Sequence, residues 1–159
     1  MCDDACARGD MADIAAHWQV AGQSAFFVAE LTDGEVVGCV GVRRGGLNDE
    51  ATAAGGTLAE PRSVSVWKVS THERARGLGV ARRLMAAAEV WAAEEARAER
   101  VVLMTASSGA KAFYARLGYA LVEGSTRGTE LSVWIKELGA QACIDGRLGC
   151  HQCTRLGLH

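Results

Sequence analysis

A strand-like run leads through two glycines into a helical pattern in the middle of this sequence, and few folds accommodate that order. Residues 66–71 read Val-Trp-Lys-Val-Ser-Thr, Gly77 and Gly79 follow, and from Leu78 to about Ala98 apolar positions recur at steps of three and four. The first pattern is typical of a strand and the last of an amphipathic helix. A glycine turn directs several backbone N–H groups to one point, and the helix N-terminus behind it is electropositive. The sequence therefore predicts a site for a phosphorylated ligand at this turn.

Length and composition exclude several classes of protein. The chain has 159 residues, of which 49% are hydrophobic and 23% charged, as expected for one globular domain. Its net charge is −2 and it has no long basic run, so we expect no nucleic acid partner. No apolar stretch reaches the roughly 18 residues of a membrane span, and residues 1–4 do not resemble a signal peptide. We therefore expect a cytoplasmic protein, away from membranes, with a small-molecule partner.

The rest of the pattern predicts an α/β fold. The expected elements are a short helix (11–20), two strands (24–31 and 35–42), a long surface loop (43–61), a strand (63–71), the helix already described, a buried strand (101–105), a helix (108–117) and two strands (119–123 and 129–137). Asp33-Gly34 indicates that the first two strands form a hairpin. The strand–helix–strand crossover implies that the third and fourth strands pair in parallel. We expect a mixed, mostly antiparallel sheet flanked by helices.

The end of the chain has no apolar period, so we predict a folded domain over residues 10–138 and a disordered tail over 139–159. The six cysteines are Cys2, Cys6, Cys39, Cys143, Cys150 and Cys153. Cys150 and Cys153, with His151 between them, have the spacing of half a zinc site, but a structural site needs four ligands. Free thiols and no bound metal are therefore expected.

Two motifs follow each other along the middle of the chain. The first is Arg-Gly-Leu-Gly-Val-Ala at residues 76–81, and the second is Ala-Lys-Ala-Phe-Tyr-Ala-Arg-Leu-Gly-Tyr at 110–119. Their order and spacing resemble the GNAT superfamily of acyl-CoA N-acetyltransferases. The second motif is similar to the family signature Ala-x-x-Leu-Tyr-x-x-Leu-Gly-Phe, with Phe113 in place of Leu and Tyr119 in place of Phe.

The resemblance covers about residues 10–138 and implies the GNAT fold, here shortened at its N-terminal side. Members generally carry a strand and two helices before the first hairpin, whereas about 23 residues precede Ser24. Residues 26–30 and 68–70 also resemble the branch that acetylates the amines of aspartate and cysteine conjugates. Because part of the acceptor side is missing, the membrane attachment of some relatives in that branch does not transfer to this chain.

The resemblance implies an enzyme that moves an acetyl group from acetyl-CoA to a primary amine of a small molecule or amino acid. The implied cofactor-binding residues are Val69, Thr71, Arg76, Gly77, Gly79, Val80, Ala81 and Ser107. In the family the pyrophosphate lies on the backbone of the glycine loop. The pantetheine arm lies between the strands that end here at Thr71 and Thr105. Ser107 stands where members often have an Asn and can still cap the following helix.

Tyr114 is the implied catalytic residue, because a phenol near the sulfur can give a proton to the departing thiolate. A packing role between helix and sheet is the alternative interpretation of this tyrosine. The base that deprotonates the amine stays open among Glu73, His72, Glu60, Glu30 and a water molecule.

Two further functions fit the same motifs. One is a non-catalytic acyl-CoA-binding module whose shortened acceptor side has lost the chemistry, and the other is an acetyltransferase of protein amines. The sequence determines neither the acceptor nor the oligomeric state.

Overall fold

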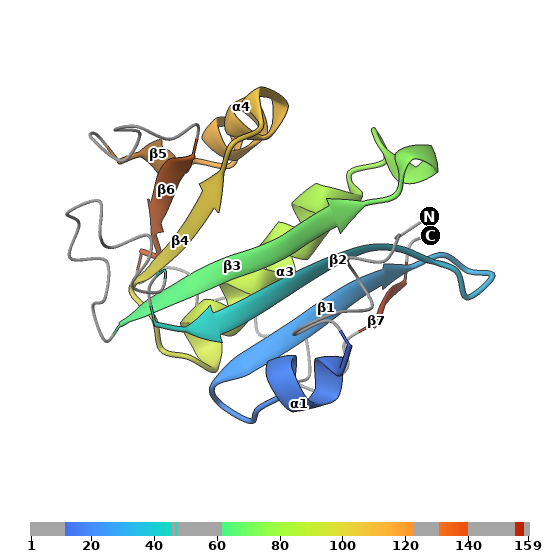
Figure 1. Cartoon of the computed structure of the whole chain (residues 1–159), viewed down its shortest axis with the longest axis horizontal. Helices are drawn as coiled ribbons and strands as arrows, with labels where there is room; N and C mark the ends of the chain where they lie inside the picture. The colour runs from blue at the N-terminus through green and yellow to red at the C-terminus, as the bar shows by residue number, and fades with distance from the viewer. Residues whose placement is uncertain (1–11, 46, 48–61, 123–130, 140–154, 158–159) are drawn as a thin grey trace.

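A computed structural model of the chain describes residues 12–45, 47, 62–122, 131–139 and 155–157. The elements in chain order are α1 (Ile14–Trp18), β1 (Ser24–Glu30), β2 (Val36–Arg44), β3 (Ser63–Thr71), the 3-10 turn η2 (Glu73–Ala75), α3 (Val80–Glu94), β4 (Arg100–Thr105), α4 (Ser108–Arg116), β5 (Ala120–Leu121), β6 (Ser132–Glu137) and β7 (Arg155–Gly157). Figure 1 shows them as one twisted sheet with helices on both faces.

The sheet has the strand order β5-β6-β4-β3-β2-β1-β7. β3 pairs with β4 in parallel, as the crossover predicted, and β7 pairs with β1 in parallel. The other four neighbouring pairs are antiparallel. The expected mixed, mostly antiparallel sheet flanked by helices is therefore confirmed.

The first hairpin forms where Asp33-Gly34 indicated it. The Asp33 side chain accepts a hydrogen bond from the backbone N–H of Glu35 at 3.0 Å, and Gly34 has a positive φ of 89°. A left-handed residue is what a tight turn of this kind needs, and glycine adopts it without strain.

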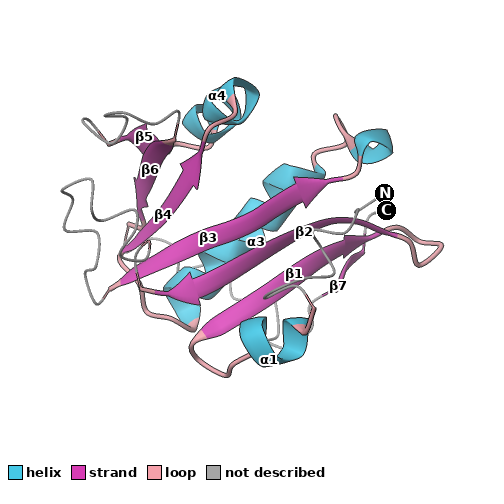
Figure 2. Ribbon diagram, viewed as in Figure 1, coloured by secondary structure: helices cyan, strands magenta, loops and turns pink. Residues whose placement is uncertain are grey.

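Two glycines of β2 show that α1 and α3 cover opposite faces of the sheet. A Cβ on Gly41 would lie 2.6 Å from the ring of Trp18 in α1. One on Gly38 would lie 3.0 Å from side-chain atoms of both Val80 and Leu84 in α3. Since the two positions are three apart on a strand, they point to opposite faces. Figure 2 shows α3 running behind the strands and α1 in front of them.

The helix after the glycine loop begins later than its apolar pattern suggested. α3 starts at Val80, because Gly77 and Gly79 have φ values of 80° and 75° that no right-handed helix contains. Leu78, expected on the apolar face, is 64% exposed. The helix ends at Glu94, before Arg97 takes a positive φ of 52°.

The predicted last hairpin exists as the antiparallel pair of β5 and β6, both shorter than expected. The sequence pattern predicted no strand after residue 138, whereas β7 pairs with residues 28–30 of β1. Most of the predicted loop 43–61 and most of the tail 139–159 lie outside the described residues, so the domain boundaries stay a prediction.

Every cysteine except Cys39 also lies outside the described part, and Cys39 is a free thiol. Where the structure describes the chain, it shows no cluster of three metal-ligating side chains. The described part likewise contains no helix that is both long enough and apolar enough to span a bilayer.

Candidate active site

The parallel ladder between β3 and β4 stops halfway along β3. Residues 63–66 of β3 pair with residues 100–103 of β4, and the paired part ends at Val66 and Leu103. Beyond this point β4 stays paired with β6 as far as Thr105 and Ser132. The two strands diverge toward their C-terminal ends, as Figure 1 shows. Residues 67–71 of β3 therefore border a widening gap.

The same half of β3 contains a bulge on its β2 side. Cys39 of β2 is opposite Ser70, but Gly41 is opposite Trp67, so β3 has one residue more than β2 in this interval. Lys68 within it has a positive φ of 56°, which is uncommon for a residue with a side chain. The Cys39 thiol donates a hydrogen bond to the Lys68 carbonyl oxygen at 3.4 Å.

The backbone of Thr71 faces the gap. His72 donates its N–H to the Val37 carbonyl of β2 at 2.8 Å. Backbone groups alternate in direction along an antiparallel strand, so the N–H and C=O of Thr71 point away from β2. Both groups are thus positioned to bond a ligand lying between β3 and β4.

The glycine loop leads from η2 to the N-terminus of α3. Gly79 is the N-cap of the helix and makes no side-chain capping hydrogen bond, so among the residues that the structure describes the first turn of α3, which begins at Val80, has no side-chain cap. Apart from its chain neighbours, a Cβ on Gly77 or on Gly79 would meet no atom of the described residues within 4 Å. The Val80 side chain is buried in the core and holds the start of the helix in place. The loop therefore presents backbone donors beside open space.

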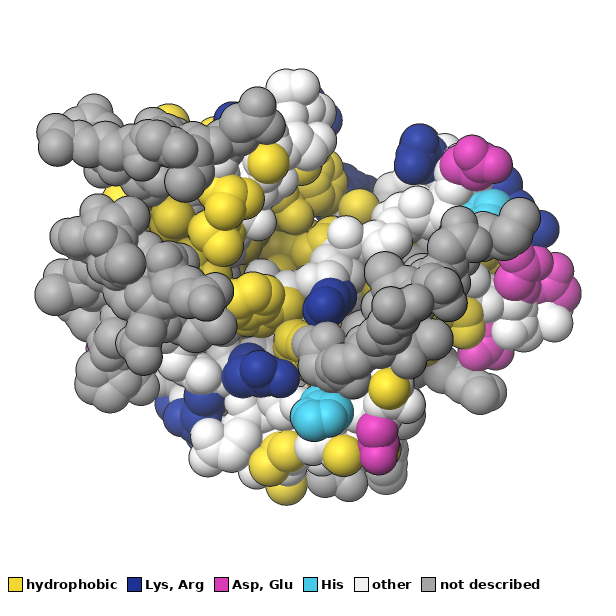
Figure 3. Space-filling model, viewed as in Figure 1, with side chains coloured by type: hydrophobic (Ala, Val, Ile, Leu, Met, Phe, Trp, Pro, Cys, Tyr) yellow, Lys and Arg dark blue, Asp and Glu magenta, His cyan; other side chains and the backbone are white. Residues whose placement is uncertain are grey.

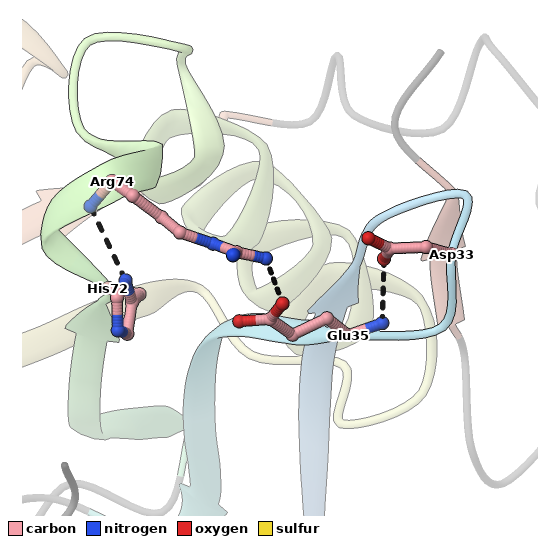
Figure 4. Close-up of polar contacts among 4 residues, drawn as sticks. All are labelled: Asp33, Glu35, His72 and Arg74. Atoms are coloured by element: carbon pink, nitrogen blue, oxygen red, sulfur yellow. Dashed lines mark hydrogen bonds and ion pairs between the residues drawn. The ribbon is translucent and has the colours of Figure 1, made fainter.

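A cavity of about 430 Å³ opens between the start of β2 and the end of β3, lined by residues 36–39, residues 70–73 and Arg76. Arg74 of η2 forms an ion pair with Glu35, which directly precedes β2 (Figure 4). This pair ties η2 to the first hairpin beside the cavity. Of the predicted cofactor residues, Thr71 and Arg76 line this cavity, and the other six do not: Val69, Gly77, Gly79, Val80, Ala81 and Ser107.

The candidate bases differ in their surroundings. His72 and Glu73 line the cavity, whereas Glu30 lies in β1 and Glu60 is outside the described residues. The Nδ1 atom of His72 accepts the backbone N–H of Arg74 at 3.3 Å (Figure 4). An accepting Nδ1 is unprotonated, so in the neutral ring Nε2 holds the proton and cannot accept another.

Tyr114 lies in α4, whose N-terminus Ser107 caps by accepting the N–H of Ala110 at 3.3 Å. Its side chain is only 6% exposed and belongs to the main hydrophobic core. The ring centres of Phe113 and Tyr119 are 5.2 and 5.9 Å from that of Tyr114. Burial raises the pKa of Tyr114 above its ordinary value of 10.0, so the phenol keeps its proton at neutral pH.

The face of the sheet opposite α3 carries an apolar surface beside the gap. There Leu47, Val102 and Val133 form a second hydrophobic cluster, against which Trp67 and Met104 pack. Figure 3 shows hydrophobic side chains gathered in a hollow on this face.

Sequence reasoning did not predict the contact between Cys39 and Lys68. Their contact depends on the bulge, and nothing in the local pattern indicated one. A glycine or another bulge-prone residue at position 68 would have indicated a bulge, but a lysine does not.

Comparison with known proteins identifies the family. Residues 4–119 match the model of the acetyltransferase (GNAT) family. A GNAT-family acetyltransferase from Staphylococcus aureus Mu50 is 16% identical, with a TM-score of 0.64 over 87% of this chain and 80% of that one. An acetyltransferase from Streptococcus agalactiae 2603 is 19% identical, with a TM-score of 0.58 over 81% and 75%. No functionally curated protein matches the chain.

These likenesses show the fold, and the family match covers well over half of the sequence. They do not distinguish the branch suggested by residues 26–30 and 68–70. The chain belongs to the GNAT acetyltransferase family, whose members transfer acyl groups.

Proposed function

We propose that this protein is an N-acetyltransferase that moves an acetyl group from acetyl-CoA to the primary amine of a small molecule or amino acid. The single observation that carries the proposal is the loop from Arg76 to Ala81 beside the unpaired edge of β3. The loop suits a pyrophosphate, and the unpaired edge of β3 suits the amide-containing arm attached to that pyrophosphate.

Binding of the donor uses backbone groups. The N–H groups of Gly77, Gly79, Val80 and Ala81 hold the pyrophosphate, with Arg76 adding a positive charge at the start of the loop. The space beside Gly77 and Gly79, free of protein atoms within 4 Å, supports this assignment. Val69 and Thr71 hold the pantetheine arm by their backbone groups, and Ser107 fixes the start of α4 at the far side of the gap.

The chemistry needs a neutral amine, because an ammonium group has no lone pair. A base or a water molecule removes one proton from the amine, and the nitrogen attacks the carbonyl carbon of the thioester. The new C–N bond forms, the C–S bond breaks, and the sulfur leaves with the electron pair. Tyr114 gives its phenolic proton to that sulfur, and the nitrogen, which still carries one proton too many, loses it through water to the tyrosinate, which leaves a neutral amide and a neutral phenol.

Two of the candidate bases, His72 and Glu73, line the cavity. Glu73 lines the cavity and a carboxylate accepts a proton directly, whereas the Nε2 of His72 holds its own proton in the neutral ring. We propose that Glu73, or a water molecule bound by it, serves as the base.

A thiol-release assay with acetyl-CoA and a panel of amines tests the proposal. We expect turnover with at least one small amine and none without an acceptor. Calorimetric binding of acetyl-CoA with no turnover on any amine, protein amines included, would instead show a non-catalytic binding module. Turnover confined to lysine-containing peptides would show a protein acetyltransferase.

A further inference from the structure

The residue after Gly118 differs from the family signature, and the group that it adds makes a hydrogen bond within the fold. The signature has Phe where this chain has Tyr119, so the side chain gains a hydroxyl group. Tyr119 is only 4% exposed, and its hydroxyl donates a hydrogen bond to Oε1 of Glu89 in α3 at 3.0 Å. Burial and the nearby carboxylate raise the pKa of Tyr119 far above 10.0, so this hydroxyl remains a donor at any physiological pH.

The other carboxylate oxygen of Glu89 has a partner from the sheet. Lys136 of β6 donates from Nζ to Oε2 of Glu89 at 2.7 Å, and the same ammonium group lies 5.5 Å from the centre of the Tyr119 ring. The side chains of Lys136 and Glu89 are 27% and 19% exposed. Half-buried charges are costly when unpaired, but here both carboxylate oxygens are satisfied. Tyr119, Glu89 and Lys136 thus form a polar triad that joins α3, β6 and the segment after α4.

The triad contacts Tyr114 in two ways. The ring of Tyr119 meets the ring of Tyr114 edge to face, with centres 5.9 Å apart and planes at 64°. The backbone N–H of Tyr119 also donates to the Tyr114 carbonyl oxygen at 3.1 Å. Fixing Tyr119 by its far end therefore restricts both the ring and the backbone of Tyr114.

We propose that the triad of Tyr119, Glu89 and Lys136 positions the Tyr114 phenol for proton transfer, which makes its members positioning residues of the reaction. The inference rests on the proposed role of Tyr114 as the acid. Proton donation to a departing sulfur depends on distance, and a displacement of about 1 Å in a catalytic group can cost up to two orders of magnitude in rate. A phenylalanine at residue 119 would fill the same space but would not be held at its outer end.

The test is a double-mutant cycle between Tyr119→Phe and Tyr114→Phe. Tyr119→Phe restores the residue of the family signature and leaves the ion pair of Glu89 and Lys136 in place, so we expect a folded protein with a modestly lower melting temperature. We expect kcat to fall about tenfold with the KM for acetyl-CoA unchanged. In the Tyr114→Phe background the same substitution should lower the melting temperature equally but leave kcat where it was.

Two more variants separate positioning from general stability. Glu89→Gln keeps an acceptor for the Tyr119 hydroxyl but loses the charge that holds Lys136, so kcat should fall less than in Tyr119→Phe. Glu94→Gln, at the end of the same helix and outside the triad, is the matched control and should not change kcat.

The outcomes distinguish this inference from the proposed function. If Tyr114→Phe lowers kcat but Tyr119→Phe does not, the positioning role of the triad is wrong, whereas the role of Tyr114 as the acid is supported. If Tyr119→Phe lowers kcat by the same factor in both backgrounds, the triad acts only on the fold and the inference fails. If Tyr114→Phe keeps full kcat, the role of Tyr114 as acid fails, and the triad has no acid to position.

Discussion

Gly79→Ala separates the loop's role in binding from its role in folding. Gly79 has φ 75° and ψ 13°, the left-handed region, where a residue with a Cβ costs about 1–2 kcal/mol. Part of this is offset because alanine has less freedom than glycine in the unfolded chain, which leaves a net loss of about 1 kcal/mol. The Cβ itself meets no protein atom within 4 Å, so no collision adds to the cost. For a chain of this length the melting temperature should fall by about 2–4 °C.

Gly22→Ala is the matched control for this experiment. Gly22 has a φ of 69°, and its added Cβ also meets nothing within 4 Å, but it lies in the turn before β1, away from the loop. Both variants should therefore lose similar stability in thermal unfolding. Only Gly79→Ala should weaken the binding of acetyl-CoA, because its methyl group enters the space proposed for the pyrophosphate.

Titration calorimetry measures the difference. We expect the Kd of Gly79→Ala for acetyl-CoA to rise at least about tenfold, equal to roughly 1.4 kcal/mol of binding free energy, and that of Gly22→Ala to stay at the wild-type value. Wild-type affinity for acetyl-CoA in both variants would refute the assignment of the loop to the pyrophosphate. Equal losses in both would show that the effect comes from stability alone.

Three other perturbations follow from named contacts. Tyr114→Phe should lower kcat by about 10²–10⁴ while the Kd for acetyl-CoA stays constant, since only the proton donor is removed; full kcat between pH 6 and 9 would assign Tyr114 to packing. Gly38→Ala should reduce the free energy of unfolding in urea by about 1–3 kcal/mol, because its Cβ would lie 2.9 Å from the Ser70 carbonyl oxygen, whereas Gly109→Ala in α4 should reduce it not at all. Raising the pH above about 10 should lower the free energy of unfolding. The pKa values of Tyr114 and Tyr119 are raised in the folded state, so the unfolded chain loses these protons first. Tyr119→Phe should make the decline of the unfolding free energy with pH shallower, and an unchanged slope would contradict this account.

Local signals in the sequence predicted most of the fold. The third strand, residues 63–71, was predicted with the bounds that β3 has, because β-rich residues there follow a glycine-rich stretch without period. The start of α3 was misplaced because Leu78 fits the apolar period, yet it lies between two residues with left-handed backbone. The strand β7 could not be predicted, since three residues carry no usable pattern and its pairing with β1 spans most of the chain.

The candidate site was predictable as far as it depends on contiguous residues. The glycine loop and the capping of α4 by Ser107 both follow from local chemistry. The triad could not be predicted from local chemistry, because Glu89 and Lys136 are 47 residues apart and meet only when β6 pairs beside β4. A sequence pattern cannot indicate which carboxylate a buried hydroxyl will find.

The position of the site follows from two interruptions of the same strand. On its β2 side, β3 contains the bulge at Lys68, which adds local twist and shifts the register of residues 69–71. On its β4 side, the ladder ends at Val66, so the backbone of Thr71 points into the gap. A strand paired regularly on both edges would have no backbone group left for a ligand. Under the proposed function, these backbone groups of β3 and the first N–H groups of α3 together hold a ligand that has amides at one end and a pyrophosphate at the other.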